Sequence, residues 1–419
     1  MKNKIFLVSI LLFTMLLFLY GCTSKENQSN TSKHSDCMWD YSSGIQPYIS
    51  MLHAQVLMQP NGFYFVEPTK SMLYFYDYKA KRSVLVCNKP DCEHRSGYND
   101  DGGIFTVEGD DALQASIGTP PTDCNAFLGT TGNLTIYNNR IYYDSNYGSD
   151  IGVSNHSIYS IKMDGTDRRV ELKNYITLRP NDGVMIFFSG DKFFFSKSID
   201  ETHNVLNMVD LHTKKITKLV KTDPSKIFDD IPVRYKNFVY YILWNKFDEE
   251  NPKYVGTLYQ FSLKTKKTTA IYTGDIAGYT FVKNQIYFSD GKSICKMTLN
   301  GNDLTPVFEV PGYLDICFDG KYLYLDEEAF LGLNQPIVNP IFVTKLDGSK
   351  IDSMERLTGY PLYGDQNAFF YYYTYKLEDD SYYRGLVMLK KTDLGKPHHY
   401  YDLVTGKEVS IEQLTKKLN

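Results

Sequence analysis

The sequence predicts an all-β fold, a β-propeller of seven blades, and three observations support this prediction. A two-part phrase of aromatic and β-branched residues recurs seven times along the 419 residues. Five of the six spacings between successive copies lie near the roughly 40 to 50 residues of a four-stranded blade. Patterns with a helical period are nearly confined to residues 410–418. Six or eight blades are the alternatives.

The first part of the phrase is a short strand that follows a turn. Its copies are spaced by 78, 52, 45, 48, 36 and 47 residues and begin at Phe63, Ile141, Phe193, Phe238, Ile286, Tyr322 and Phe369. Turn pairs such as Asn61-Gly62 and Asp319-Gly320 precede nearly every copy, which makes each strand the second arm of a hairpin. The spacing of 78 residues indicates an insertion between the first two copies.

The second part of the phrase is another strand, which ends in a turn. Its copies are residues 73–79, 158–165, 205–213, 258–265, 294–301, 341–348 and 386–395. Several of the turns contain residues that tolerate the positive φ of tight hairpins, namely Asp164-Gly165, Asn300-Gly301 and Asp347-Gly348. A short polar strand follows each of them, so the phrase accounts for the later strands of one blade.

Two other all-β architectures fit the pattern less well. A β-helix needs shorter and more uniform rungs, and a sandwich does not keep one period through the whole chain. Blades of a propeller pack face to face, so both sides of a strand are covered and its sequence becomes a continuous apolar run. Residues 369–375, F-F-Y-Y-Y-T-Y, form such a run.

Closure of the ring requires a contact between the two ends of the chain. In many propellers, a strand from the opposite end of the chain completes the last blade. The segment His53–Met58 precedes the first repeat and has no evident partner there. One hypothesis is that it docks beside the C-terminal strand near Tyr400–Val404.

The second repeat carries a resemblance to a known family. Its phrases are residues 141–144, I-Y-Y-D, and residues 158–170, I-Y-S-I-K-M-D-G-T-D-R-R-V. They resemble the repeat of the YWTD propellers of the low-density-lipoprotein-receptor type, and more closely that of a group of uncharacterised bacterial lipoproteins with a related propeller. The resemblance covers about residues 45–405, although the Trp-Thr pair is lost in every repeat. It implies the propeller fold and a surface location, with no assigned activity.

The N-terminus has the order of an export signal: Lys2 and Lys4, an apolar run from Ile5 to Leu19, and then small residues. At about 1.5 Å per residue the run reaches roughly 22 Å, short of the ~30 Å hydrocarbon core. The Leu19-Tyr20-Gly21-Cys22 segment resembles the lipobox of bacterial lipoproteins, in which the Cys receives a diacylglyceryl group. We therefore expect lipidation of Cys22 and a location on the extracytoplasmic face of the cell membrane; an uncleaved anchor and ordinary secretion are the alternatives.

These observations give a domain organisation. We expect a signal peptide at 1–21, the lipidated Cys22 and a flexible tether at 22–44, the propeller at 45–409 with an insertion at about 87–135, and a C-terminal tail at 410–419. The formal net charge of −4 provides no positive excess to attract nucleic acid. We expect a monomer that contacts the membrane through its lipid.

The insertion contains a set of metal-binding residue types. Cys87, Cys92, His94 and Cys124 stand in the segments C-N-K-P-D-C-E-H and C-N-A, which resemble elements often found in the same bacterial lipoproteins. A Cys₃His set suits tetrahedral zinc, and with all four ligands from protein the site would be structural rather than catalytic. Export to an oxidising compartment favours instead a disulfide of Cys124 with Cys92 or Cys87.

The number of cysteines does not decide between structural zinc and a disulfide. Cys37 brings the number of unassigned cysteines to an even one, as disulfide pairing requires, and a set with neither function is a third alternative. We expect Cys295 and Cys317, which lie inside apolar strands, to be buried small hydrophobes. No cofactor other than this structural zinc is expected.

Motifs of hydrolytic enzymes are absent from the sequence. It contains no G-x-S-x-G, H-E-x-x-H or Walker-type glycine loop. We expect the acidic clusters to be solvated loops, and His398-His399 to be an exposed or edge-strand pair rather than a metal site. Tyrosines of predicted loops are better candidates for stacking against a ligand, namely Tyr147, Tyr254, Tyr360 and Tyr363.

The sequence therefore predicts a non-catalytic scaffold that binds an unknown protein, peptide or glycan in the cell envelope. The alternative is a propeller hydrolase or lyase that acts on envelope polysaccharide. Such an enzyme needs two carboxyl groups facing each other across a sugar.

Overall fold

A computed structural model describes residues 56–95, 122–129, 134–145, 154–178, 186–200, 203–222, 226–227, 232–245, 255–327, 340–355, 357, 359–376 and 382–415. The chain divides into two units, Met1–Cys37 and Met38–Asn419, and all described residues belong to the second. The expected signal peptide, Cys22, the tether and Cys37 lie outside the described residues. Within these ranges, no helix has the length and apolar character that crossing a membrane requires.

The described strands form seven antiparallel sheets, and in six of them each strand pairs with the next strand in the chain. The first three sheets are β1 (Val56–Gln59), β2 (Gly62–Glu67), β3 (Met72–Asp77) and β4 (Arg82–Leu85); β5 (Leu134–Tyr137), β6 (Arg140–Ser145), β7 (Ser154–Lys162) and β8 (Arg169–Leu178); and β9 (Ile186–Ser189), β10 (Lys192–Asp200), β11 (His203–Asp210) and β12 (Ile216–Lys221). Each is a four-stranded meander, as the two-part phrase predicts.

The remaining sheets follow the same plan, with two additions. They are β13 (Lys226–Ile227), β14 (Val233–Tyr235), β15 (Phe238–Asn245), β16 (Val255–Ser262) and β17 (Thr268–Asp275); β18 (Tyr279–Val282), β19 (Gln285–Ser289), β20 (Ser293–Thr298) and β21 (Thr305–Glu309); β22 (Leu314–Phe318), β23 (Leu323–Glu327), β24 (Ile341–Thr344) and β25 (Lys350–Met354); and β26 (Gly359–Leu362), β27 (Ala368–Lys376), β28 (Tyr382–Lys390), β29 (Tyr400–Asp402) and β30 (Glu408–Val409). In the fourth sheet β13 and β14 both pair with β15, and in the seventh β30 extends the outer edge. The 3₁₀ turn η1 (Lys391–Asp393) follows β28, and α3 (Ile411–Thr415) lies within the predicted tail.

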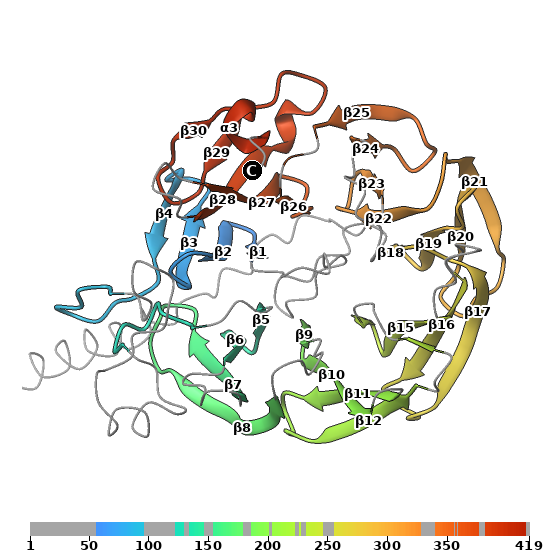
Figure 1. The fold of residues 1–419 in the computed structure, drawn as a ribbon, viewed down its shortest axis with the longest axis horizontal. Coiled ribbons are helices and arrows are strands. Elements are labelled where there is room, and N and C mark those ends of the chain that lie inside the picture. The colour runs from blue at the N-terminus through green and yellow to red at the C-terminus, as the bar shows by residue number, and fades with distance from the viewer. Residues whose placement is uncertain are drawn as a thin grey trace, which may run out of the picture. The chain divides into compact units, whose positions relative to one another are not determined.

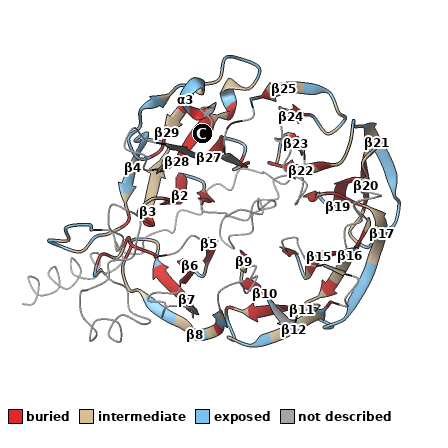
Figure 2. Cartoon of the chain, in the orientation of Figure 1, coloured by how far each residue is buried: buried red, intermediate tan, exposed pale blue. Residues whose placement is uncertain are grey.

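The seven sheets follow one another around a ring, so the fold is a seven-bladed β-propeller (Figure 1). The first strand of a blade lies toward the centre and the last at the rim, as β5 to β8 illustrate. Figure 2 shows the same gradient in burial, from buried inner strands to exposed outer strands. The prediction of seven blades is confirmed, and the alternatives of six and eight are excluded.

Apolar clusters between adjacent blades hold the ring together. Seven clusters of buried residues each join two neighbouring sheets. The cluster that contains Phe63 and Phe370 joins the last sheet to the first. Strand β15 shows how one strand serves two clusters, because Val239 and Tyr241 pack toward the third blade whereas Tyr240 and Ile242 pack toward the fifth. This two-sided burial explains why the strands are continuous aromatic and aliphatic runs.

The hypothesis that a strand is exchanged between the chain ends is wrong. Val56–Gln59 forms β1, which pairs with β2 inside the first blade, whereas β29 pairs with β28 and β30 inside the last. Side-chain packing closes the ring instead: Phe63 and Phe370 meet edge to face with their ring centroids 4.8 Å apart. The hydroxyl of Ser83 also donates a hydrogen bond to the carbonyl of Leu403.

Candidate metal centre

Four side chains from two segments converge between the first and second blades. Cys87, Cys92 and His94 belong to the segment that follows β4, and Cys124 belongs to the segment before β5. Their sulfur and ring-nitrogen atoms all lie within 4.8 Å of one another. Cys124 Sγ is 3.8 Å from His94 Nδ1. The structure thus brings together all four residues that the sequence analysis singled out.

The first segment folds tightly around the sulfur atom of Cys87. Asp91 and His94 adopt left-handed backbone angles, with φ of 58° and 54°, which reverse the chain after Pro90. The amides of Lys89 and Asn125 donate hydrogen bonds to Cys87. Lys89 also forms an ion pair with Asp123, at 3.7 Å between Nζ and Oδ2. The two segments are therefore connected directly to each other.

Cys87 and Cys124 differ in acidity. Burial raises the pKa of Cys87, but amide donors from both segments and the neighbouring thiols outweigh that effect and lower it. Burial raises the pKa of Cys124 to about 12, although the amide of Ala126 donates to it. A cation bound among the sulfur atoms would favour the thiolate form of every cysteine in the cluster.

The first blade holds the segment that carries Cys124. The Leu73 amide donates to the Ala126 carbonyl at 2.7 Å, and the Leu128 amide donates to the Ser71 carbonyl at 3.0 Å. Met72 and Phe127 form an isolated antiparallel bridge. Ala126, Phe127 and Leu128 are buried in the cluster shared by the first two blades, against which Cys87 and Cys92 also pack.

The second blade supports the same segment through the turn between β7 and β8. Arg168 Nη2 donates to the carbonyls of Cys124, Asn125 and Phe127 at 3.0, 2.8 and 2.6 Å. Gly165 lies against Val86, so closely that an added Cβ atom would be 2.4 Å from the Val86 carbonyl oxygen. Gly165 and Arg168 both belong to the D-G-T-D-R-R phrase of residues 164–169, so the repeated turn of the second blade supports the cysteine segments that lie against the first.

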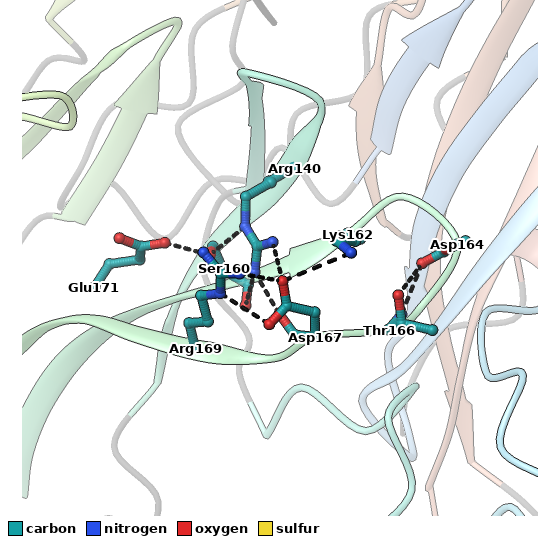
Figure 3. A network of polar contacts seen from close by, with 8 residues as sticks. All are labelled: Arg140, Ser160, Lys162, Asp164, Thr166, Asp167, Arg169 and Glu171. Carbon is teal, nitrogen blue, oxygen red and sulfur yellow. Dashed lines mark hydrogen bonds and ion pairs between the residues drawn. The ribbon is translucent and has the colours of Figure 1, made fainter.

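A polar network fixes this turn (Figure 3). Asp167 is its centre and forms ion pairs with Arg140 at 3.0 Å and with Arg169 at 2.5 Å. The hydrogen bond from Arg169 is the main reason that the pKa of Asp167 is lowered. Asp164 accepts the Thr166 hydroxyl at 2.6 Å. The network leaves Arg168, which is not part of it, directed at the cysteine segment.

The remaining sequence candidates occupy structural positions. Cys295 and Cys317 are buried, which confirms that prediction. Tyr363 is only 3% exposed, and its hydroxyl donates to Asp326 Oδ2 at 3.1 Å, so it is a core residue rather than a ligand platform. The side chains of Tyr147, Tyr254 and Tyr360 lie outside the described residues.

The expectation of an exposed histidine pair is correct for His399 and wrong for His398. The His398 side chain is 4% exposed and its Nε2 and Nδ1 atoms lie 2.9 Å from Asp352 and 2.7 Å from Glu355. Asp352 belongs to β25, so this contact joins the sixth blade to the seventh. The sequence gives no signal for it, because the partners are 43 and 46 residues away.

His398 is expected to make stability depend on pH. Burial lowers the pKa of His398, but hydrogen bonds with Glu355 and Asp352 outweigh that effect and raise it above 6.5. A raised pKa means that the folded state binds the proton more tightly, so the stabilisation is full below about pH 6.5 and is lost as pH rises through the higher folded value. In thermal unfolding between pH 6 and 8, His398→Gln should flatten this decline.

His399→Gln is the matched control for this measurement, because His399 is 51% exposed in its pair with Glu408. Its pH profile should follow that of the unmodified chain. Identical profiles for His398→Gln and the unmodified chain would show that His398 does not titrate as a partner of these carboxylates.

The buried carboxylates of the described residues are held by the fold itself. They are Glu67, Asp144, Asp319, Asp326, Asp365 and Asp402. Asp144, for example, accepts the Tyr175 hydroxyl at 2.7 Å and lies 2.8 Å from His156 Nδ1. Asp365 accepts the backbone amide of Asn367 at 2.8 Å, in the turn before β27. Each of the six is engaged in a turn, a tyrosine contact or an ion pair.

Comparisons with known proteins do not identify a family. No protein-family model matches the chain, and no curated protein matches it. Among solved structures, the chain is similar to TolB from Acinetobacter baumannii, with 13% identity, a TM-score of 0.36, and coverage of 80% of this chain and 76% of that one.

Two further solved structures are similar to the chain at an equally low level. An oligogalacturonate lyase in complex with manganese has 13% identity and a TM-score of 0.34, over 61% of this chain and 72% of that one. The β-propeller domain of the Trilobed protease from Pyrococcus furiosus has 14% identity and a TM-score of 0.39, over 67% and 95%. None of these likenesses assigns an activity to this chain.

Proposed function

We propose that this protein is a lipid-anchored, extracytoplasmic propeller that acts as a non-catalytic binding scaffold in the cell envelope. The observation that carries the non-catalytic part is the engagement of the buried carboxylates. A polysaccharide hydrolase or lyase needs a pair of carboxyl groups free to meet the substrate. The six buried carboxylates among the described residues instead accept hydrogen bonds from their own turns and tyrosines or form ion pairs.

The sequence of the N-terminus supports the anchor. Leu19, Gly21 and Cys22 follow a charged and then apolar segment, in the order that lipoprotein processing requires. Several acyl chains on Cys22, at about 0.8 kcal/mol for each buried CH₂, would retain a soluble propeller at the membrane. The ligand is proposed as a protein, peptide or glycan that contacts one face of the ring.

Fatty-acid labelling tests the anchor. The full chain, expressed in a bacterium fed an alkyne fatty acid, should carry the label and lose the mass of residues 1–21. Cys22→Ser should lose both the label and the cleavage, whereas Cys37→Ser should keep both. A labelled Cys22→Ser chain, or an unlabelled wild-type chain, would contradict lipidation at this residue.

A parallel assay separates the scaffold from the enzyme. The purified full chain in detergent is screened against glycan and wall-peptide arrays, and the same preparation is incubated with envelope polysaccharides and assayed for new reducing or unsaturated ends. The scaffold proposal predicts saturable binding without new ends. Release of ends that scales with protein concentration would favour the hydrolase or lyase.

A further inference from the structure

The close approach of four donor atoms distinguishes a zinc site from a disulfide in the cysteine insertion. A disulfide joins two sulfur atoms about 2.05 Å apart and makes no use of a third cysteine or a histidine. A tetrahedral zinc site places its sulfur ligands about 3.8 Å apart, because each Zn–S bond is about 2.3 Å long. Here three sulfur atoms and one ring nitrogen share a volume within which no pair is more than 4.8 Å apart. A metal requires this arrangement, whereas a disulfide does not.

The backbone amides that donate to the sulfur atoms also favour a metal site over a disulfide. Backbone amides of Lys89 and Asn125 donate to Cys87, and that of Ala126 donates to Cys124. Amide hydrogen bonds offset the negative charge of metal-bound thiolates, and such outer contacts orient the ligands. One of these three donors, Lys89, lies in the turn after β4 and the other two lie in the Cys124 segment, so the site is built by both segments.

We propose that Cys87, Cys92, His94 and Cys124 bind one Zn²⁺ ion in a closed, structural site. All four ligands come from the protein, so the ion has no open position for substrate. Its role is to join the segment that follows β4 to the segment that precedes β5. The ion thereby holds the start and the end of the insertion on the first two blades.

The second blade takes part in this site through Arg168. Its guanidinium donates to the carbonyls of Cys124, Asn125 and Phe127 in the Cys124 segment, so it positions the ligand without touching the metal. Arg234, in β14 of the fourth blade, instead forms an ion pair with Asp191 at 3.1 Å and has no part in the turn between β7 and β8. The two arginines therefore form a matched pair for testing the positioning role.

Metal analysis of the full chain tests the proposal. Protein purified in detergent without added metal should contain one zinc per chain by mass spectrometry of the elements. Replacement by Co²⁺ should give the intense d–d bands of tetrahedral cobalt and thiolate-to-cobalt charge-transfer bands. Cys92→Ser and His94→Gln should lose the metal, and Cys295→Ser, which changes a buried thiol in the fifth blade, should retain it.

The arginine pair gives a readout that a loss of folding would not imitate. Arg168→Met should weaken zinc affinity by about 10- to 100-fold, the usual effect of removing an outer-shell contact, while Arg234→Met should leave it unchanged. A metal-free protein with a Cys92–Cys124 or Cys87–Cys124 disulfide in non-reducing peptide mapping would overturn the proposal. Equal zinc affinities of the two arginine variants would overturn the positioning role of Arg168.

Discussion

Replacing Lys391 with methionine is expected to lower the free energy of unfolding by about 3–5 kcal/mol, the usual cost of removing one partner from a buried ion pair. Lys391 Nζ lies 2.6 Å from Asp319 Oδ2, and the two side chains are 2% and 0% exposed. The same ammonium group donates to the Tyr363 carbonyl at 2.6 Å and lies 4.5 Å from the centre of the Tyr324 ring. Methionine fills the space of the stem but leaves the Asp319 carboxylate buried without its cation.

A second substitution isolates the electrostatic cause. Asp319 also accepts backbone amides of its own turn through Oδ1, at 2.8 Å from Lys321 and 2.7 Å from Tyr322, and asparagine preserves that acceptor. Adding Asp319→Asn to Lys391→Met should therefore recover part of the lost stability in urea or thermal unfolding. Lys396→Met, at an exposed position, should stay within about 0.5 kcal/mol of the unmodified chain. A Lys391→Met chain as stable as Lys396→Met would show that the pair contributes little.

The blade architecture was predictable because its signals are local. Turn residues and aromatic runs lie within one meander, and each first phrase became a second strand, as Phe63 did in β2 and Phe369 did in β27. The mode of closure was not predictable from the same signals, because Val56–Gln59 has a strand pattern that suits either partner. A hairpin with β2 closes a loop of two residues, whereas pairing with the C-terminal strand closes one of more than 300, and the entropy of loop closure favours the hairpin.

The candidate metal centre was likewise predictable only in part. Its four ligands are recognisable from residue type and spacing, since thiols and imidazole are the donors that zinc prefers. The contributions of Arg168 and Gly165 are not recognisable, because they depend on how the second blade abuts the first. The contact of His398 with Asp352 is hidden for the same reason. What the repeat pattern leaves out is therefore the contact between blades, which side-chain packing decides.

Gly301→Ala is expected to lower the stability of the protein strongly, because it disturbs such a contact between blades. Gly301 lies in the turn between β20 and β21 at a φ of 85°, and an added Cβ atom would stand 2.1 Å from the Ile271 carbonyl oxygen in β17 of the preceding blade. The left-handed angle costs an alanine about 1–2 kcal/mol. Overpacking against backbone that cannot move aside adds about 1–3 kcal/mol. Urea unfolding should therefore show a loss of roughly 2–5 kcal/mol, the sum of these two effects.

Gly406→Ala separates the two effects. Gly406 has a φ of 70° in the turn between β29 and β30, but nothing lies within 4 Å of its added Cβ atom, so only the cost of the backbone angle applies. Equal losses for the two variants would mean that the clash with Ile271 is relieved by a small movement of the blades. A larger loss at Gly301 would mean that the turn glycine is required by the neighbouring blade as well as by its own hairpin. The equivalent Gly165 and Gly348 also abut the blade before them, which gives the recurrent Asp/Asn-Gly pair a role in joining blades.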